Sequence, residues 1–434
     1  MLTLESVISA AWRAALIGGA VAAVATLPGL GIGTLWDNSE TTYGEVAREV
    51  LLYHDPVVLH LNGDPWFIQP PLYFWIAALF AKVLGLSEFA LRLPSALATI
   101  AMSGAVAYVV ARLVSLRAAI LSAVVLSTSL MQAVVGRLAI MDALLDLTVA
   151  LAILAWFATL RNGDARAWYG GWAALGLGAL AKGPVAPVVA ALVIGVWALW
   201  ETRTGRRLVW PSPAAWAGGV ALFAAIVAPW TIALVHTAGL PAIAELVGHY
   251  TFGRYVNVIE NQPGPIWYYV PVVVLGFFPW FAYLVPASLY ATREARNGHG
   301  GLARLALVWA IIPFVFFSFA QTKLPNYIAL EFPALAILVG VWFDDIVASG
   351  NRRAALLWTA VVPIGLVAVG IAIWAFSNDN RLSHDLQALR VGLLELGICV
   401  LLGSLLCFAL LTSRRYAWLG PFALGATSLA VMLA

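Results

Sequence analysis

The stretch LWDNSETTYGEVAREVL, residues 35–51, opens the one long polar interval in a chain that is otherwise apolar. Its apolar residues recur at helical spacing, which predicts an amphipathic helix. Four acids lie within it: Asp37, Glu40, Glu45 and Glu49. Carboxylates gathered at one water boundary of a membrane protein are typical of a site of chemistry.

The rest of the chain has the composition of an integral membrane protein. It has 434 residues, of which 62% are hydrophobic and 10% charged, and its mean hydropathy is +0.92. A soluble fold cannot bury that much apolar surface in one core, so we expect an all-α polytopic membrane protein. Runs of about 17 to 25 apolar residues predict about thirteen transmembrane helices. They lie near 14–33, 94–112, 117–134, 142–160, 168–181, 184–200, 214–236, 267–290, 304–320, 327–344, 354–375, 388–411 and 417–434.

The arginines predict which loops face the cytoplasm. With the N-terminus inside and 14–33 retained as an anchor, paired arginines fall in every second loop, as the positive-inside rule requires. These are Arg112 and Arg117, Arg161 and Arg166, Arg203, Arg206 and Arg207, Arg293, Arg296 and Arg304, Arg352 and Arg353, and Arg414 and Arg415. The opposite side receives most of the acids and a few isolated cations. We expect one domain over 1–434 with two external loops, 35–93 with amphipathic juxtamembrane helices and 237–266, and no C-terminal soluble domain.

Seven segments in this order resemble a known family. They are SETTYGEVAREVLLYHD (39–55), HLNGDPWFIQPPLYFW (60–75), GLSEFALRLPSAL (85–97), GRLAIMDALL (136–145), ALAKGPVAPVV (179–189), PIWYYVPVVVLGFFPW (265–280) and QTKLPNYIALEFPAL (321–335). Together they are similar to the GT-C-type glycosyltransferases that use polyprenyl-phosphate sugars, in the branch of lipid A aminoarabinose transferase, with protein O-mannosyltransferases more distant. The similarity covers about residues 30–340.

The resemblance implies a glycosyltransferase in the bacterial inner membrane, with its active site on the periplasmic or extracellular face. It takes a sugar from a polyprenyl phosphate and passes it to a hydroxyl of a lipid, glycan or protein. Such a transfer needs a carboxylate base for the hydroxyl, on the face opposite the leaving group if the reaction inverts. It also needs fixed cations for the departing phosphate.

The candidate bases come from two segments. The family motif Asp-Glu-x-x-Tyr matches Glu40 and Tyr43, but its Asp position is Ser39. We expect Asp37, two residues upstream, to be the base, with Glu40 second. The alternative is that the residues before Glu40 cap the helix that begins there. Asp142 in GRLAIMDALL matches a third family acid, whose alternative roles are favourable interaction with its helix dipole or pairing with Arg137.

Lone cations at external helix ends are the candidates for phosphate binding. Lys182, Arg254 and Lys323 match cationic positions of the family and stand against the positive-inside trend. Phosphate contact explains them, and snorkelling to lipid headgroups is the alternative. Tyr43, Tyr327 and Arg137 complete the expected donor-binding set.

Two departures from the relatives bear on metals. Where the aminoarabinose transferase has Glu-Lys-Pro this chain has Ile68-Gln69-Pro70, and an expected His is Gln262. In the relative, those Glu and His positions are associated with a metal. Because this chain lacks both side chains, no metal and no cofactor are expected.

Two other classes compete with the transferase. A transporter or flippase of lipid-linked sugars would place polar sites near the bilayer midplane and often show inverted halves. A non-catalytic scaffold would not need isolated external cations. A partnership with nucleic acid is excluded by the lack of a basic stripe.

Overall fold

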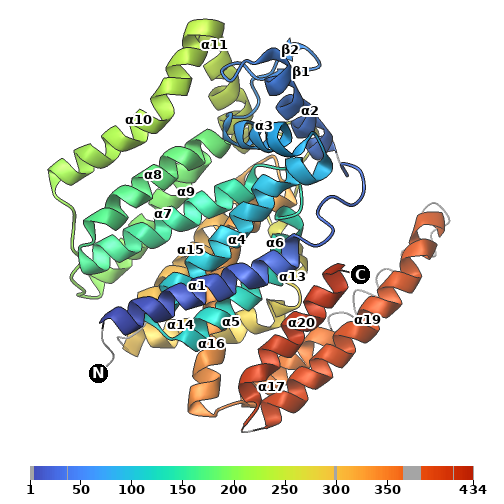
Figure 1. Cartoon of the computed structure of the whole chain (residues 1–434). Helices are drawn as coiled ribbons and strands as arrows, with labels where there is room; N and C mark the ends of the chain where they lie inside the picture. The colour runs from blue at the N-terminus through green and yellow to red at the C-terminus, as the bar shows by residue number, and fades with distance from the viewer. Residues whose placement is uncertain (1–3, 37, 298–300, 365–382, 414, 434) are drawn as a thin grey trace.

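The chain folds almost entirely into helices, as the computed structural model shows for residues 4–36, 38–297, 301–364, 383–413 and 415–433. Figure 1 traces them in chain order. The first half contains α1 (Leu4–Thr26), α2 (Asn38–Tyr53), β1 (His60–Leu61), β2 (Asp64–Pro65), α3 (Leu72–Leu84), α4 (Glu88–Leu113), α5 (Leu116–Ser127), α6 (Leu130–Val135), α7 (Asp142–Asn162), α8 (Ala165–Lys182), α9 (Val185–Arg203) and α10 (Pro213–Ala238). The second half contains α11 (Leu240–Ile243), η1 (Ala244–Gly253), α12 (Arg254–Val256), α13 (Tyr269–Gly276), η2 (Trp280–Tyr283), α14 (Leu284–Asn297), α15 (Gly301–Phe319), η3 (Pro325–Glu331), α16 (Phe332–Ser349), α17 (Arg353–Thr359), α19 (Ser383–Thr412), η4 (Ala417–Leu419) and α20 (Gly420–Leu433).

The helical membrane fold is confirmed, but the expected count of thirteen spans is not. Within the described residues, 7 helices are long and apolar enough to cross a membrane, or 8 if one bent pair forms a single span. They are Ile8–Thr26, Glu88–Leu113, Asp142–Asn162, Val185–Arg203, Pro213–Ala238, Gly301–Phe319 and Pro325–Ser349, and the bent pair is Tyr269–Gly276 with Trp280–Arg293, at 109°. The segment expected at 354–375 extends into residues 365–382, which lie outside the described part of the chain.

The expected span at 117–134 is divided into two short helices, and side-chain hydrogen bonds at the break give the reason. Thr128 Oγ1 donates to Val124 O at 2.6 Å, and Ser129 Oγ donates to Leu126 O at 2.8 Å. These hydroxyls compete with the backbone for the last carbonyls of α5, which favours a break rather than a continuous helix. Hydropathy alone does not detect such a break.

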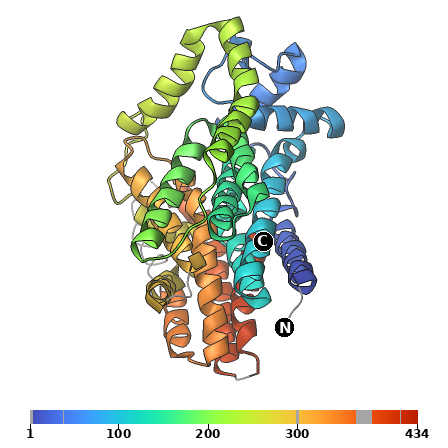
Figure 2. The same cartoon turned by 90° about the vertical axis from the view of Figure 1, so that its left-hand side faces the viewer.

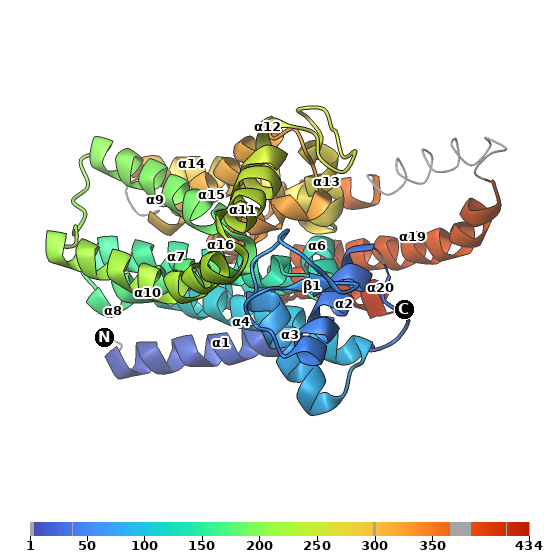
Figure 3. The same ribbon diagram turned by 90° about the horizontal axis from the view of Figure 1, so that it is seen from above.

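The long helices separate two ends of the molecule. Figure 1 shows α2, β1, β2 and α11 together at one end of α7, α8, α9 and α10. Figure 2, turned by 90°, keeps the same elements together at the top. Seen from above in Figure 3, α1 lies on one side of the bundle and α9, α14 and α15 on the other.

Small residues allow the helices to pack closely. A Cβ added to Gly18 of α1 would lie 2.9 Å from Ala107 Cβ of α4, and one on Gly340 of α16 would lie 2.2 Å from Ser122 Oγ of α5. Close backbone approach through small residues is how helices associate in a membrane, where lipid tails compete for apolar contacts.

Arginines from loops far apart in sequence meet at the end opposite α2. Glu201 accepts from Arg304 Nε at 2.5 Å and lies 3.6 Å from Arg206 Nε. Arg117 pairs with Asp344. A Cβ on Gly301 would collide with the guanidinium of Arg161. Four of the predicted cytoplasmic arginines, Arg117, Arg161, Arg206 and Arg304, therefore lie at this end of the bundle.

Candidate active site

Two adjoining cavities lie at the end that carries α2. The first, the polar cavity, has a volume of about 600 Å³ and is lined by α2, the segment after β2, the loop before α7, and the segments around Glu260 and Tyr327. The second, the apolar cavity, has a volume of about 270 Å³ and is lined largely by apolar residues of α9, α15 and η1. Six residues line both cavities: Gln69, Asp142, Lys182, Arg254, Asn326 and Tyr327. These six residues form the candidate site.

Asp142 and Lys182 form an ion pair where the two cavities meet. Lys182 Nζ donates to Asp142 Oδ1 at 2.5 Å, and the Asp142 side chain is 5% exposed. Asp142 is the first residue of α7, where a carboxylate interacts favourably with the helix dipole. Lys182 ends α8, and Gly183, at φ +68°, turns the chain into α9. The Ala-Lys-Gly-Pro turn after α8 thus places Lys182 beside Asp142 at the N-terminal end of α7.

Arg254 and Tyr327 form the second half of the site. Arg254 Nη1 donates to the Tyr327 hydroxyl at 3.2 Å, and Arg254 Nη2 lies 2.7 Å from Glu260 Oε1. Lys182 Nζ lies 4.9 Å from the centre of the Tyr327 ring, a cation–π contact. Burial alone would lower the pKa of Arg254, but Tyr327 and Glu260 outweigh it and raise that pKa. Tyr327 therefore lies between two fixed positive charges.

Tyr43 lies in the wall of the polar cavity, within an aromatic cluster. Its ring centre is 5.7 Å from that of Phe74 and 6.2 Å from that of Trp66. Burial, and then the negative charge of Asp142, raise the pKa of the Tyr43 hydroxyl. Tyr43 therefore keeps its proton at neutral pH and can donate a hydrogen bond to a ligand.

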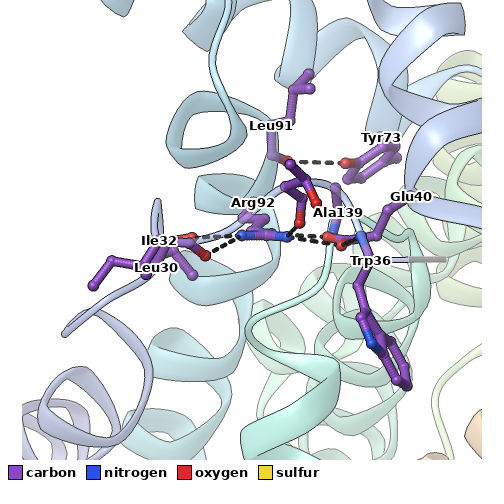
Figure 4. A network of polar contacts seen from close by, with 9 residues as sticks. Leu30, Ile32, Trp36, Glu40, Tyr73, Leu91, Arg92 and Ala139 are labelled. Carbon is purple, nitrogen blue, oxygen red and sulfur yellow. Dashed lines mark hydrogen bonds and ion pairs between the residues drawn. The ribbon is translucent and has the colours of Figure 1, made fainter. Parts of the chain in front are cut away.

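Glu40 lies in a different place from its neighbours Ser39 and Tyr43. It is fully buried, and Figure 4 shows it paired with Arg92. It is not among the described residues that line either cavity. Burial would raise the pKa of Glu40, but the hydrogen bonds from Arg92, Trp36 N and Ala139 N outweigh it and lower that pKa. The carboxylate thus remains ionised and engaged with protein groups, which is not the position of a base that meets substrate.

Two of the expected phosphate-binding cations also point elsewhere. The ammonium of Lys323 donates to Ser318 O at 2.8 Å and to Ala320 O, so it caps the C-terminal end of α15. Arg137 donates to Ala25 O at 3.2 Å and to Pro28 O at 2.6 Å. Neither residue is among the described cavity-lining residues. Asp37, the first choice for the base, lies outside the described part of the chain.

Sequence reasoning missed Asn326 and Glu260 and noted Gln69 only as a departure. Asn326 directly precedes Tyr327, a residue that the sequence analysis did single out. Glu260 begins the polar ENQPG run that follows Arg254. Among the described residues, no three or more His, Cys, Asp and Glu side chains group as a metal site would require. Gln262 Oε1 and Arg254 Nε are buried with no hydrogen-bond partner among those residues.

Known proteins are similar to this chain in sequence and in fold. A family model described as dolichyl-phosphate-mannose-protein mannosyltransferase matches residues 68–232. An undecaprenyl phosphate-alpha-4-amino-4-deoxy-L-arabinose arabinosyl transferase of Erwinia tasmaniensis is 30% identical over 83% of this chain and 64% of its own length. The protein of that name from Edwardsiella ictaluri is 28% identical over 88% of this chain and 69% of its own length. The chain is similar to these glycosyltransferases of GT-C type over most of its length.

The GT-C fold extends over nearly the whole chain. The crystal structure of ArnT from Cupriavidus metallidurans bound to undecaprenyl phosphate superimposes with a TM-score of 0.82, covering 96% of this chain and 75% of that one at 24% identity. The apo form of the same protein gives a TM-score of 0.77. This chain spans about two thirds of the length of the curated GT-C relatives, at 69% and 64%.

Proposed function

We propose that this GT-C glycosyltransferase moves a sugar from a polyprenyl phosphate to an acceptor hydroxyl of a lipid, glycan or protein. The observation that carries the proposal is the junction of an apolar and a polar cavity at Asp142, Lys182, Arg254 and Tyr327. A polyprenyl-phosphate sugar has the matching three parts: an apolar chain, an anionic link and a polar sugar. The undecaprenyl-phosphate substrates named for the curated relatives support the same donor class.

The membrane side follows from the charges. The arginine-rich end around Glu201 faces the cytoplasm by the positive-inside rule. The two cavities lie at the other end, so the site faces the periplasm or cell exterior of a bacterial inner membrane. In this orientation, the 35–93 and 237–266 loops of the single domain proposed over 1–434 lie on the outer side.

Asp142 is the base in this proposal, because among the acids expected to be catalytic it is the described one that lines the cavity. The acceptor oxygen attacks the anomeric carbon while its proton passes to the Asp142 carboxylate. The bond between that carbon and the phosphate oxygen breaks, and polyprenyl phosphate leaves with the bonding electrons. Inversion results, because the base and the leaving group lie on opposite faces of the sugar.

Arg254 is the principal phosphate ligand. Lys182 touches Asp142 directly, so a phosphate seated on Lys182 alone would place the leaving group beside the base rather than across the sugar from it. Arg254 has a buried Nε that no described residue engages, and its planar guanidinium suits a phosphate. Tyr327 and Tyr43 supply hydroxyl donors, and Lys182 orients Asp142 through their ion pair.

The decisive experiment combines lipid analysis with a transfer assay. Mass spectrometry of lipids copurified with the protein is expected to show a polyprenyl phosphate. Incubating detergent-solubilised protein with polyprenyl-phosphate sugars and envelope extract is expected to yield a new glycoside and free polyprenyl phosphate. Movement of the intact donor across sealed vesicles, without any chemical change, would instead indicate a flippase.

A further inference from the structure

The buried ion pair of Glu40 and Arg92 joins three segments that are distant in sequence. Glu40 Oε1 accepts from Arg92 Nε at 2.9 Å and from Ala139 N at 2.6 Å. Glu40 Oε2 accepts from Arg92 Nη2 at 2.9 Å and from Trp36 N at 2.8 Å. Arg92 also donates to Leu30 O at 3.1 Å and to Thr34 O at 2.9 Å. Figure 4 shows the pair at the centre of these contacts.

The Ala139 contact reaches toward Asp142. Ala139 lies in the loop 136–141, whose next residue is Asp142, the first residue of α7. Leu138 and Ile140 of this loop also line the polar cavity. The position of the loop therefore determines where Asp142 lies and where part of the cavity wall lies.

The side of α4 that faces this loop carries further polar groups. Ser95 Oγ, one turn after Arg92, donates to Ile140 O at 2.8 Å. A Cβ on Gly136 would lie 2.7 Å from Thr99 Oγ1. Residues 92, 95 and 99 share one helix face, so α4 supports the whole loop and Glu40 links its Ala139 end to α2.

We propose that Glu40 is a positioning residue, which holds the loop 136–141, and with it Asp142, through its ion pair with Arg92. The inference rests on the role proposed above for Asp142. It explains why an acid in the first external loop is buried away from the cavities while its neighbours Ser39 and Tyr43 line one of them. It also separates Glu40 from the base, a role for which the sequence analysis ranked Glu40 second after Asp37.

Kinetics distinguish positioning from proton transfer. Glu40→Gln is expected to lower kcat by about 10- to 100-fold with little change in KM, since a base displaced by about 1 Å costs that much. The pH dependence of the remaining activity should match the wild type, because Asp142 still takes the proton. Loss of the acidic limb of the pH profile in Glu40→Gln would make Glu40 itself the base and overturn the inference, because a base is active only when deprotonated.

A second substitution tests whether the effect runs through the ion pair. Glu40→Gln leaves Arg92 buried without its counter-charge, so Glu40→Gln with Arg92→Gln is expected to recover at least about 10-fold of the lost turnover. Asp142→Asn should gain nothing from Arg92→Gln. A double variant no better than Glu40→Gln would contradict a role through Arg92.

Hydrogen exchange provides a readout that does not need activity. In lipid nanodiscs, Glu40→Ala should speed the exchange of amides 136–141. Glu49→Ala is the matched control, because Glu49 is an equally buried acid of the same helix that instead accepts from Gly63 N at 3.0 Å, in the β1–β2 turn. If the exchange changes as expected but the wild type transfers no sugar, the proposed function fails and the positioning stands. If the wild type transfers sugar and Glu40→Ala leaves amides 136–141 protected from exchange, the positioning role of Glu40 is wrong and the proposed function stands.

Discussion

Both ends of the helix bundle contain buried ion pairs, but only one end holds them against the two cavities. At the cavity end Lys182 pairs with Asp142, and Arg254 pairs with the half-exposed Glu260. At the arginine end Glu201 pairs with Arg304, and both are at least 97% buried. Neither of these two lines the polar or the apolar cavity.

The comparison shows that burial and pairing alone do not identify a functional charge. Ionisable groups inside a membrane protein are costly to bury, so both clusters need an explanation. The arginine cluster is explained by its packing role, since Glu201 joins α9 to Arg304 of α15 and to Arg206 of the loop after α9. The ion pairs at the cavity end lie beside open space. A ligand that binds there can replace one member of a pair.

The largest effect expected is on turnover at the cavity end. Asp142→Asn should lower kcat by about 10²- to 10⁴-fold, because the general base is lost. The measurement is the rate of glycoside formation, normalised to folded protein. Glu201→Gln, normalised in the same way, should keep nearly the wild-type rate. If Asp142→Asn stays active, Asp37 returns as the first candidate for the base.

At the arginine end the expected effect is on stability. Glu201→Gln removes the negative charge that pairs with the buried Arg304, and breaking a buried pair costs about 3–5 kcal/mol. Thermal unfolding in detergent should show a clearly lowered midpoint. Asp142→Asn should lower it much less, since Lys182 can turn toward the cavity. Equal losses in both variants would remove the distinction between the two ends.

Phosphate binding should separate cations that look alike in sequence. Arg254→Ala should weaken binding of polyprenyl phosphate by about 10- to 100-fold, the value of one charge-assisted hydrogen bond. Lys323→Ala should leave that affinity unchanged, because its ammonium caps α15. Titration with a fluorescent polyprenyl phosphate measures both. A weakened Lys323→Ala would mean that this lysine reaches the headgroup after all.

The smallest effect expected concerns Glu260. Its carboxylate pairs with Arg254 in the structure, and its side chain is 45% exposed. Exposed ion pairs contribute at most about 1 kcal/mol, so Glu260→Gln should tighten polyprenyl-phosphate binding by about 2- to 5-fold. Weaker binding in this variant would show that Glu260 contacts the donor directly rather than competing with its phosphate.

Two pairs of residues show where sequence reasoning reached its limit. Glu40 and Asp142 are both acids in the first turn of a helix at the cavity end of the bundle. Glu40 meets Arg92, 52 positions away in the chain, whereas Asp142 meets Lys182 and a cavity. Lys182 and Lys323 were both expected to be lone external lysines, yet Lys182 lines the cavities and Lys323 donates to the C-terminal end of α15.

The sequence by itself determined the membrane class, the gathering of several arginines at one end and the polar segment at residues 35–93. These depend on hydropathy and charge along neighbouring residues, which are local properties. It also grouped nine residues in one site. The structure places Asp142, Lys182, Arg254, Tyr43 and Tyr327 around the polar cavity, but not Glu40, Lys323 or Arg137, and Asp37 lies outside the described residues. Only the tertiary structure decided which charges face open space and which are closed off by protein groups. That choice depends on partners tens to hundreds of residues apart, whose meeting no local pattern encodes.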